Sequence, residues 1–344
     1  MAEVTSESEF KALLLREINI QWLNQPSGLT IEDLSADALS FFICRGQNAG
    51  HIPRDSSSLN LMQILDRLNL LTAGEVTFAG ALLFSDNPRK ISDGAYLRIC
   101  QFDANETLMR ETCIEGPLIR LPDLAIEKLY SEYIQPTNVH NYGNNSECQK
   151  YDYSKTAVAE LILNAIVHKD YGSRCPVTVA VYPDRLEIFS AGDLLGGMTV
   201  EHLTQHHTSI LRNPPLASVF RSAGFACLWG VGIVKVRNEC NSNGNPEPEF
   251  QEFRGGILVT VFKPKVKKTI SDKLTFAAID DVDRMILKLM SDNSAVTVSS
   301  ISESIGLNVR SIQRRIRALR DAGIVLREGN KYRGWWIIAE DIDF

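Results

Sequence analysis

The chain has 344 residues, of which 44% are hydrophobic, and it carries a formal net charge of −6 with an isoelectric point near 5.6. This length predicts two or three domains, at roughly 100–200 residues each. The seven cysteines are scattered without a C-x-x-C pair, which argues against a disulfide framework or a zinc cluster. No apolar run approaches a membrane span, and the first residues lack the features of a signal peptide, so we expect a cytoplasmic protein without a membrane partner. Because the chain is acidic, any DNA contact must come from a locally basic face.

The sequence of residues 1–150 predicts an α+β region, which we expect to pack on the domain formed by the residues that follow. Apolar residues recur at helical spacing in three stretches, 7–24, 59–71 and 118–134. Between them we expect a short buried element and two strands that could pair as antiparallel neighbours, at 76–84, 95–103 and 107–116. The polar loop 140–150 marks a candidate domain boundary.

Residues 151–265 predict a second α+β domain. It opens with the nearly all-apolar helix SKTAVAELILNAIVHKDY, and VTVAVYPDRLEIFSAG follows as two strands that meet at Pro183 and Asp184. With a further strand at 256–264, this pattern predicts a layer of helices on a mixed or antiparallel sheet. We expect residues 266–278, which begin basic and polar, to be a linker.

Residues 279–344 predict a winged helix-turn-helix. Apolar residues at helical spacing indicate three helices, at 282–290, 299–305 and 309–322. Gly306 lies in the turn before the third helix, and Gly323 ends that helix in the manner of a C-cap. Two strands then flank a hairpin turn at Gly329 and Asn330. This order is that of a winged helix, and it resembles MarR-like and related bacterial regulators.

The third predicted helix has two chemically different faces. Its core face is expected to hold Val309, Ile312, Ile316 and Leu319. On the opposite face arginine can fork onto guanine or clamp a phosphate, and glutamine can read adenine. Side chains at the helix start and in the wing would contact the DNA backbone or minor groove. The predicted DNA-binding residues are Asn308, Arg310, Ser311, Gln313, Arg314, Arg317, Lys331 and Arg333. The alternative is a solvated basic face used for protein contacts.

Within the apolar helix of the second domain, three polar residues form a stripe. Glu160, Asn164 and His168 are four residues apart and therefore stack on one helix face. A glutamate in an apolar helix is costly unless something pairs with it. The stripe therefore faces either a ligand or a satisfied internal network.

The run from Glu160 to Ala165, E-x-x-x-N-A, resembles the N-box of the GHKL ATP-binding fold. Together with DRLEIFSAGDLLGG, RNPPLASVF, WGVGI, PEPEF and the earlier T-x-A-G-x-L-L-F element, it resembles the divergent GHKL-like domain of bacterial transcriptional regulators called RecG-related, over roughly 55–265. The resemblance implies that Glu160 is a general base and that Asn164 holds Mg²⁺ against the phosphates of ATP. It also implies glycine-rich boxes at the nucleotide, with Ser190, Gly192, Gly196, Gly230 and Gly232 among the binding residues.

This sequence departs from the GHKL pattern in one place that matters. The first glycine box normally opens with an aspartate that reads the adenine amino group, and Ser190 stands at the matching position. Relatives often carry a Schlafen-AlbA-type domain upstream, and we expect none intact here because little chain precedes Leu59. No G-x-x-x-x-G-K-[ST] loop occurs, so the RecG-related label does not imply a helicase motor.

These patterns predict a cytoplasmic transcription regulator that binds double-stranded DNA and senses a nucleotide, with ATP and Mg²⁺ as the candidate cofactors. The predicted fold is α+β, with a GHKL-like α/β sandwich between an α+β region and a winged helix-turn-helix. A homodimer is expected from the resemblance, because operators are commonly two-fold. The alternatives are a slow Mg²⁺-dependent ATPase with Glu160 as base, and a non-catalytic interaction scaffold.

Three further clusters have simpler explanations than a functional site. His202, His206 and His207 lack an obvious third metal ligand, and a surface helix beginning after Thr199 explains them better. The acidic residues Asp280, Asp281 and Asp283 favour the start of a helix over a cation site. Of Trp335 and Trp336, we expect one to pack in the core and the other to cover the hairpin or contact a partner.

Overall fold

The computed structural model describes residues 14, 17–18, 20–54, 61–141, 146–204, 210–225, 232–264, 280–321, 324–329 and 334–338. The chain divides into two compact units, Met1–Lys265 and Val266–Phe344. Among the described residues, no helix is both long and apolar enough to cross a membrane.

The first unit is built on a six-stranded mixed sheet. Its strand order is β10-β11-β9-β8-β4-β5, with bounds Glu249–Glu252, Gly256–Phe262, Arg185–Ala191, Val177–Val181, Leu97–Phe102 and Leu108–Ile114. Only β4 and β8 run parallel, and all other neighbours are antiparallel. The predicted pairing of 95–103 with 107–116 is confirmed as β4 and β5, and the two strands joined at Pro183 and Asp184 are β8 and β9. The predicted α+β class with a mixed sheet is therefore confirmed.

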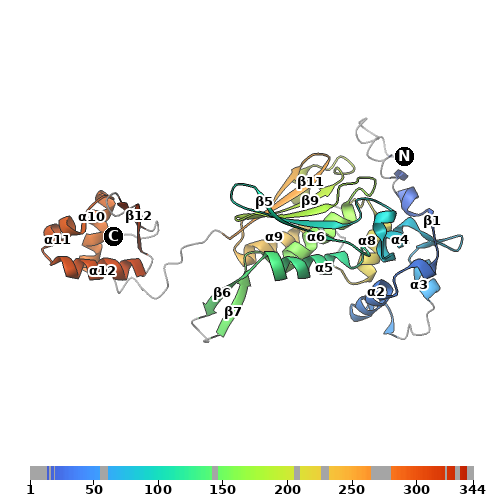
Figure 1. Ribbon diagram of the computed structural model, residues 1–344, viewed down its shortest axis with the longest axis horizontal. Coiled ribbons are helices and arrows are strands. Elements are labelled where there is room, and N and C mark those ends of the chain that lie inside the picture. The colour runs from blue at the N-terminus through green and yellow to red at the C-terminus, as the bar shows by residue number, and fades with distance from the viewer. Residues whose placement is uncertain are drawn as a thin grey trace. The chain divides into compact units, whose positions relative to one another are not determined.

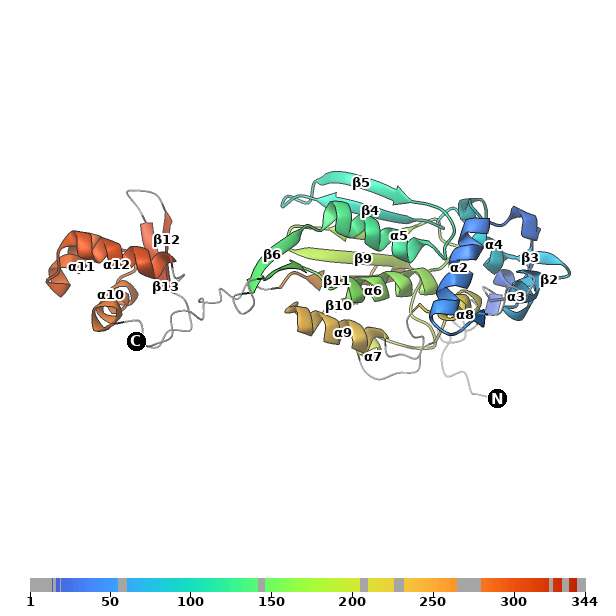
Figure 2. The same cartoon turned by 90° about the horizontal axis from the view of Figure 1, so that it is seen from below.

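Three helices cover one face of this sheet, as Figures 1 and 2 show: α5 (Leu121–Lys128), α6 (Lys155–His168) and α9 (Gly232–Asn243). The α6 helix begins at Ser154, whose hydroxyl accepts a hydrogen bond from the backbone of Ala157. Its apolar sequence is explained by burial on nearly every side, because it packs on the sheet and between the other two helices. This position fixes where the Glu160 stripe can point.

The remaining elements of this unit lie around that layer. A small sheet has the strand order β1-β3-β2, with bounds β1 (Pro26–Leu29), β3 (Glu75–Thr77) and β2 (Leu71–Thr72). It stands beside three N-terminal helices, which are α2 (Ala36–Asn48), α3 (Leu61–Arg67) and α4 (Phe78–Phe84). A separate hairpin, β6 (Pro136–Asn141) and β7 (Ser146–Tyr151), and two helices, α7 (Val200–Thr204) and α8 (Pro214–Ser222), come later in the chain. Short 3-10 turns follow β1 and α4, at Ile31–Asp33 and Pro88–Lys90, and a π-helical turn, Leu129–Tyr133, continues α5.

Two features of this arrangement differ from the expectation from sequence. The hairpin β6–β7 lies in the stretch predicted as a polar loop, whose polar composition gives no alternation typical of a strand. The proposed boundary at residue 150 also runs through the central sheet, since β4 and β5 precede it and β8 to β11 follow it. The region 1–150 and the region 151–265 share one hydrophobic core and form a single unit.

The second unit is a winged helix-turn-helix. Its described residues form three helices and a two-stranded antiparallel hairpin: α10 (Asp281–Asp292), α11 (Val298–Ile305), α12 (Val309–Asp321), β12 (Val325–Gly329) and β13 (Gly334–Ile338). Gly306 has φ +77°, the left-handed conformation that ends α11 and allows the tight turn into α12. Gly329 pairs with Gly334, so it belongs to the strand and not to the hairpin turn; residues 330–333 lie outside the described residues.

The core of this unit is separate and consists of residues from all three helices and the hairpin. Trp336 is buried in it, and its Nε1 donates a hydrogen bond to the carbonyl of Val296 at 2.9 Å. Trp335, its neighbour on the strand, is 48% exposed. The prediction that one tryptophan packs inside is confirmed.

Candidate functional site

A cavity of about 150 Å³ lies between α6, α9 and the sheet. Its wall is mostly apolar and includes Leu161, Ile188, Ile210, Ile233, Phe250, Ile257 and Val259. Its polar side chains come from three segments distant in sequence: Asn164, His168, Ser190, Asp193 and Arg212. A concave apolar pocket with a few convergent polar groups is the usual form of a small-molecule site.

Glu160 and Asn164 meet the N-terminus of α9, where Asn164 and Gly232 line the cavity and Glu160 lies behind them, not among the lining residues. Glu160 is only 3% exposed and accepts a hydrogen bond from the Asn164 side chain. A Cβ atom at Gly232, the first residue of α9, would lie 2.5 Å from Oε1 of Glu160 and 3.5 Å from Nδ2 of Asn164. Only glycine therefore allows this close approach of helix and carboxyl group.

The Glu160 carboxyl has an altered proton affinity. Burial raises its pKa, and the charge of Lys235 and the Asn164 hydrogen bond offset only part of the rise. A carboxyl group with a raised pKa holds its proton to a higher pH than a free glutamate does, which is a property of many general acids and bases. Lys235, which lies about one helical turn after Gly232, was not predicted from the sequence as part of this site.

At the other end of the cavity, the Ser190 hydroxyl is already engaged. Its Oγ donates to the carbonyl of Ala165 at 2.7 Å, which ties β9 to α6. The hydroxyl keeps its capacity to accept a hydrogen bond, as from an amino group, but it lacks the charge and the length of the carboxylate that opens the usual GHKL box. Gly192 follows with φ +125° and lines the cavity.

Arg212 holds the loop that follows Gly192, and Asn213 holds the end of α6. Arg212 is buried and donates through Nη2 to the carbonyl of Asp193 at 2.5 Å, while a Cβ at Gly192 would lie 2.9 Å from its Nε. The Asn213 amide donates to the carbonyls of Val167 and Lys169 at the end of α6. These two residues open the block RNPPLASVF but were missed as site residues, because their role depends on contacts with distant segments.

Two other glycines, Gly196 and Gly230, are also predicted to bind the nucleotide, and the structure describes only Gly196. Gly196 adopts φ +64°, and a Cβ there would meet Ile210 at 2.6 Å, but Gly196 is not among the residues that line the cavity. Its role in the described structure is to turn the loop. Gly230 lies outside the described residues.

The α12 helix has the predicted amphipathic character with one exception. Ile312, Ile316 and Leu319 are buried in the core of the winged helix, whereas Val309 is 40% exposed, so its predicted core position is wrong. Val309 is in the first turn, which extends past the edge of the core. Four of the predicted DNA-binding side chains share the exposed side of the helix: Arg310, Gln313, Arg314 and Arg317.

The start of α12 is capped by Asn308, whose Oδ1 accepts a hydrogen bond from the Ser311 backbone at 2.9 Å. Asn308 is exposed and Ser311 is half-buried. The capping bond was not foreseen for these residues, and it orients the helix start where DNA contacts were predicted. Lys331 and Arg333 lie outside the described residues.

One arginine of α12 serves the fold. Arg315 donates through Nη1 to Asp280 at 2.8 Å and to Asp283 at 2.9 Å. Asp280 also caps α10 by accepting a hydrogen bond from the backbone of Asp283. The acidic cluster therefore opens α10, as predicted, and anchors it to α12 as well.

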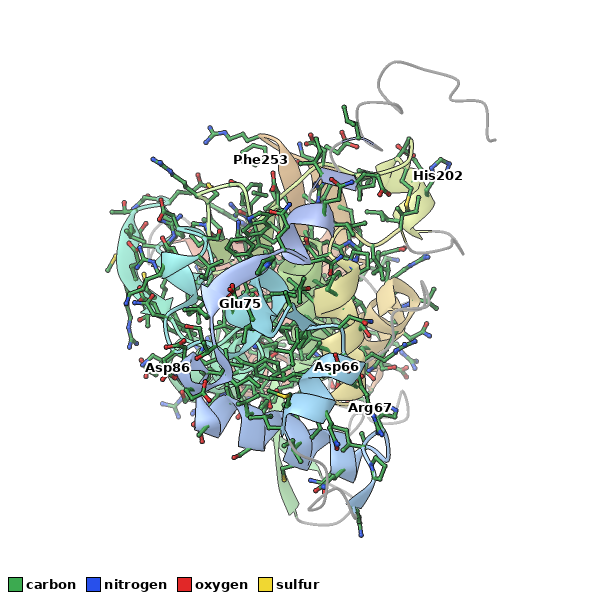
Figure 3. All side chains as sticks on the ribbon, turned by 90° about the vertical axis from the view of Figure 1, so that its right-hand side faces the viewer. Asp66, Arg67, Glu75, Asp86, His202 and Phe253 are labelled. Carbon is green, nitrogen blue, oxygen red and sulfur yellow. The ribbon has the colours of Figure 1, made fainter. Side chains whose placement is uncertain are left out.

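The histidine cluster has the predicted surface position as far as it is described. The α7 helix begins after Thr199, whose backbone N–H donates to Nδ1 of His202 at 3.1 Å. Figure 3 shows His202 at the outer surface of the first unit. His206 and His207 lie outside the described residues, and within the described part of the chain no three His, Cys, Asp or Glu side chains form a group that could hold a metal ion.

Comparisons with known proteins agree with this two-unit architecture. Residues 175–261 match the family described as "Putative ATP-dependent DNA helicase recG C-terminal", and residues 279–325 match the winged helix-turn-helix DNA-binding family. The crystal structure of the DIP2311 protein from Corynebacterium diphtheriae is similar with a TM-score of 0.58 and 18% identity, over 95% of this chain and 67% of that chain, and at this identity the likeness shows the fold alone. No curated protein sequence matches the chain. The chain thus combines a domain of the ATPase-like recG C-terminal kind with a winged helix-turn-helix domain, as its sequence predicts.

Proposed function

We propose that the protein is a transcription regulator that binds double-stranded DNA through α12. The observation that carries this proposal is the exposed row of Arg310, Gln313, Arg314 and Arg317 on a helix whose other face is buried in the core. In a chain with a net charge of −6, a locally basic face on the recognition helix is the feature expected of a DNA contact. The structure describes no ion pair for Arg310 or Arg314 with any other described residue.

The double variant Arg310→Ala with Arg314→Ala tests this proposal. The probe is a pool of random-sequence duplexes, and affinity is measured by fluorescence anisotropy at several salt concentrations. We expect weaker binding, and a salt slope that is shallower by about 0.9 for each phosphate that the variant no longer neutralises. The matched control is Arg284→Ala, which removes an exposed arginine from α10 in the same unit. Equal affinity of the double variant and the control would refute binding through α12.

A second proposed activity belongs to the cavity, which we propose is a nucleotide sensor with Mg²⁺·ATP as its ligand. The residues present fit the phosphate end: the Asn164 amide oxygen could hold Mg²⁺, and the α9 N-terminus at Gly232 favours an anion. They fit the base end less well, because Ser190 replaces the usual aspartate. Bound ATP would supply a phosphoanhydride bond, and Glu160, whose carboxyl group accepts a hydrogen bond from Asn164, would hold or accept a proton.

Calorimetric titration of Mg²⁺·ATP into the wild type and Asn164→Ala tests the cavity. Loss of binding in the variant supports a nucleotide site, and loss of phosphate release in Glu160→Gln would add turnover to it. Absence of binding at millimolar ATP would refute the nucleotide site. The protein would then be a DNA-binding protein whose cavity binds another ligand or has only a structural role. The proposed function also fits a homodimer in the cytoplasm, because two-fold operators match two-fold proteins; light scattering in solution tests the dimer.

A further inference from the structure

The exposed valine at the start of α12 has no structural role among the described residues of its unit. Val309 is the first residue of the helix and is 40% exposed, while the other apolar residues predicted to share its face are buried. The Asn308 cap fixes the helix start and with it the position of this side chain. Val309 therefore presents a branched apolar group at the end of the helix that carries the exposed arginines.

Val309 and Gln313 are neighbours on the surface of α12. The two residues are four apart, so their side chains lie on the same flank, one turn from each other. One turn separates them by about 6 Å along the helix axis, which is close to two base-pair steps of about 3.4 Å in DNA. Both side chains are exposed on a helix whose first residues are those that meet base edges in this fold.

The chemistry of the major groove offers one apolar partner for such a side chain. Valine cannot bind a phosphate or donate a hydrogen bond to a base edge, whereas the C5-methyl of thymine is the apolar group exposed in the groove. We infer that Val309 contacts a thymine methyl group and is a specificity-determining residue of the DNA site, about two base pairs from the pair that Gln313 reads. This inference rests on the proposed DNA binding and adds to it the identity of one base.

Replacing thymine by uracil removes this methyl group and nothing else from the groove. The full-length wild type first selects its preferred duplex from the random pool, and each thymine of that duplex is then replaced singly by deoxyuridine. The dissociation constants of wild type, Val309→Ala and Val309→Thr are compared for every duplex. Met285→Ala is the matched control, because Met285 is an exposed apolar residue of α10 in the same unit.

At one thymine in each half-site, we expect uracil to weaken wild-type binding by about fourfold, the value of one buried methyl group. Val309→Ala should be insensitive to uracil at that position only, Val309→Thr should keep part of the sensitivity, and Met285→Ala should respond as wild type does. The inference fails if the wild type selects a sequence but Val309→Ala shows the wild-type response at every position. If the wild type binds duplexes but selects no sequence, the inference fails alone; if it binds no duplex, the proposed DNA binding fails together with it.

Discussion

At the scale of single residues, Glu160 shows how position determines chemistry. Its place in an apolar helix removes it from water, and among the described residues the Asn164 amide and the charge of Lys235 compensate for part of the burial of its carboxylate. Gly232 leaves no space for a side chain between this carboxyl group and α9. The same features that suit a general base therefore make the ionised form of Glu160 costly to the folded chain.

This cost predicts a pH-dependent gain in stability for Glu160→Gln. Because burial raises the pKa of Glu160, the folded chain holds its proton more tightly than the unfolded chain does. The destabilising effect of Glu160 is therefore present above the raised pKa and is relieved as the pH falls through it. Urea unfolding of the first unit should show that Glu160→Gln raises the free energy of unfolding more at pH 8 than at pH 5.

The matched control for this prediction is Glu75→Gln, which changes an exposed glutamate in the same unit, labelled in Figure 3. We expect no comparable difference between the two pH values for this variant. A Glu160→Gln variant that is less stable than wild type at pH 8 would mean that the carboxylate makes stronger interactions than its surroundings indicate.

At the scale of elements, α12 carries both residues with a structural role and exposed residues that are candidates for contact with DNA. Arg315 joins α12 to α10 through Asp280 and Asp283, although it stands directly beside Arg314 in the sequence. Asn308 uses its side chain to cap the helix. A basic or polar residue on a recognition helix is thus a DNA-binding candidate only after its structural bonds are known.

The cap gives a stability prediction for Asn308→Ala. Loss of the acceptor for the Ser311 N–H should lower the free energy of unfolding of the winged helix by about 1 kcal/mol. Asn308→Ser, which keeps a capping oxygen, should lose much less. Thermal unfolding followed by circular dichroism measures both, with Ser304→Ala as a control on the exposed side of α11. Equal stability of Asn308→Ala and wild type would show that water replaces the cap at no cost.

Sequence periodicity predicted the parts of the fold that depend on near neighbours. It placed Ile312, Ile316 and Leu319 in the core, and it stacked Glu160 and Asn164 on one face, because helical spacing determines both. It failed for Val309, since periodicity does not show where the supporting core ends. The predicted roles of the individual site residues remain predictions, except where the contacts described above assign them a structural bond.

Features that depend on distant segments were not predictable in this way. The boundary predicted at residue 150 separates β4 from β8, but these strands pair, with Leu97 opposite Val177. The local sequence of either strand does not indicate pairing with a strand so far away in the chain. The role of Arg212 was missed for the same reason: its partner is the backbone of Asp193 on another loop. In both cases the information lies in the tertiary arrangement and not in the composition of either segment.

At the scale of the whole molecule, the chain consists of two compact units, each with its own core. The candidate nucleotide cavity lies in the first unit, and the candidate DNA-binding helix lies in the second. A ligand in one unit can alter the other only if it binds two states of the whole protein with different affinity. Regulation by nucleotide therefore requires a measurable coupling free energy, which must be the same whichever ligand binds first.

If the cavity is a sensor, saturating Mg²⁺·ATP should change the dissociation constant of the full-length protein for its selected duplex by at least about fivefold. DNA should change the affinity for ATP by the same factor, since the coupling is reciprocal. Asn164→Ala should abolish the response to ATP while leaving DNA affinity without nucleotide unchanged, because Asn164 lies in the first unit. Calorimetry and anisotropy on the same preparations give both constants. Binding of ATP with an unchanged DNA affinity would contradict nucleotide control of DNA binding and would separate the two sites into independent activities of one chain.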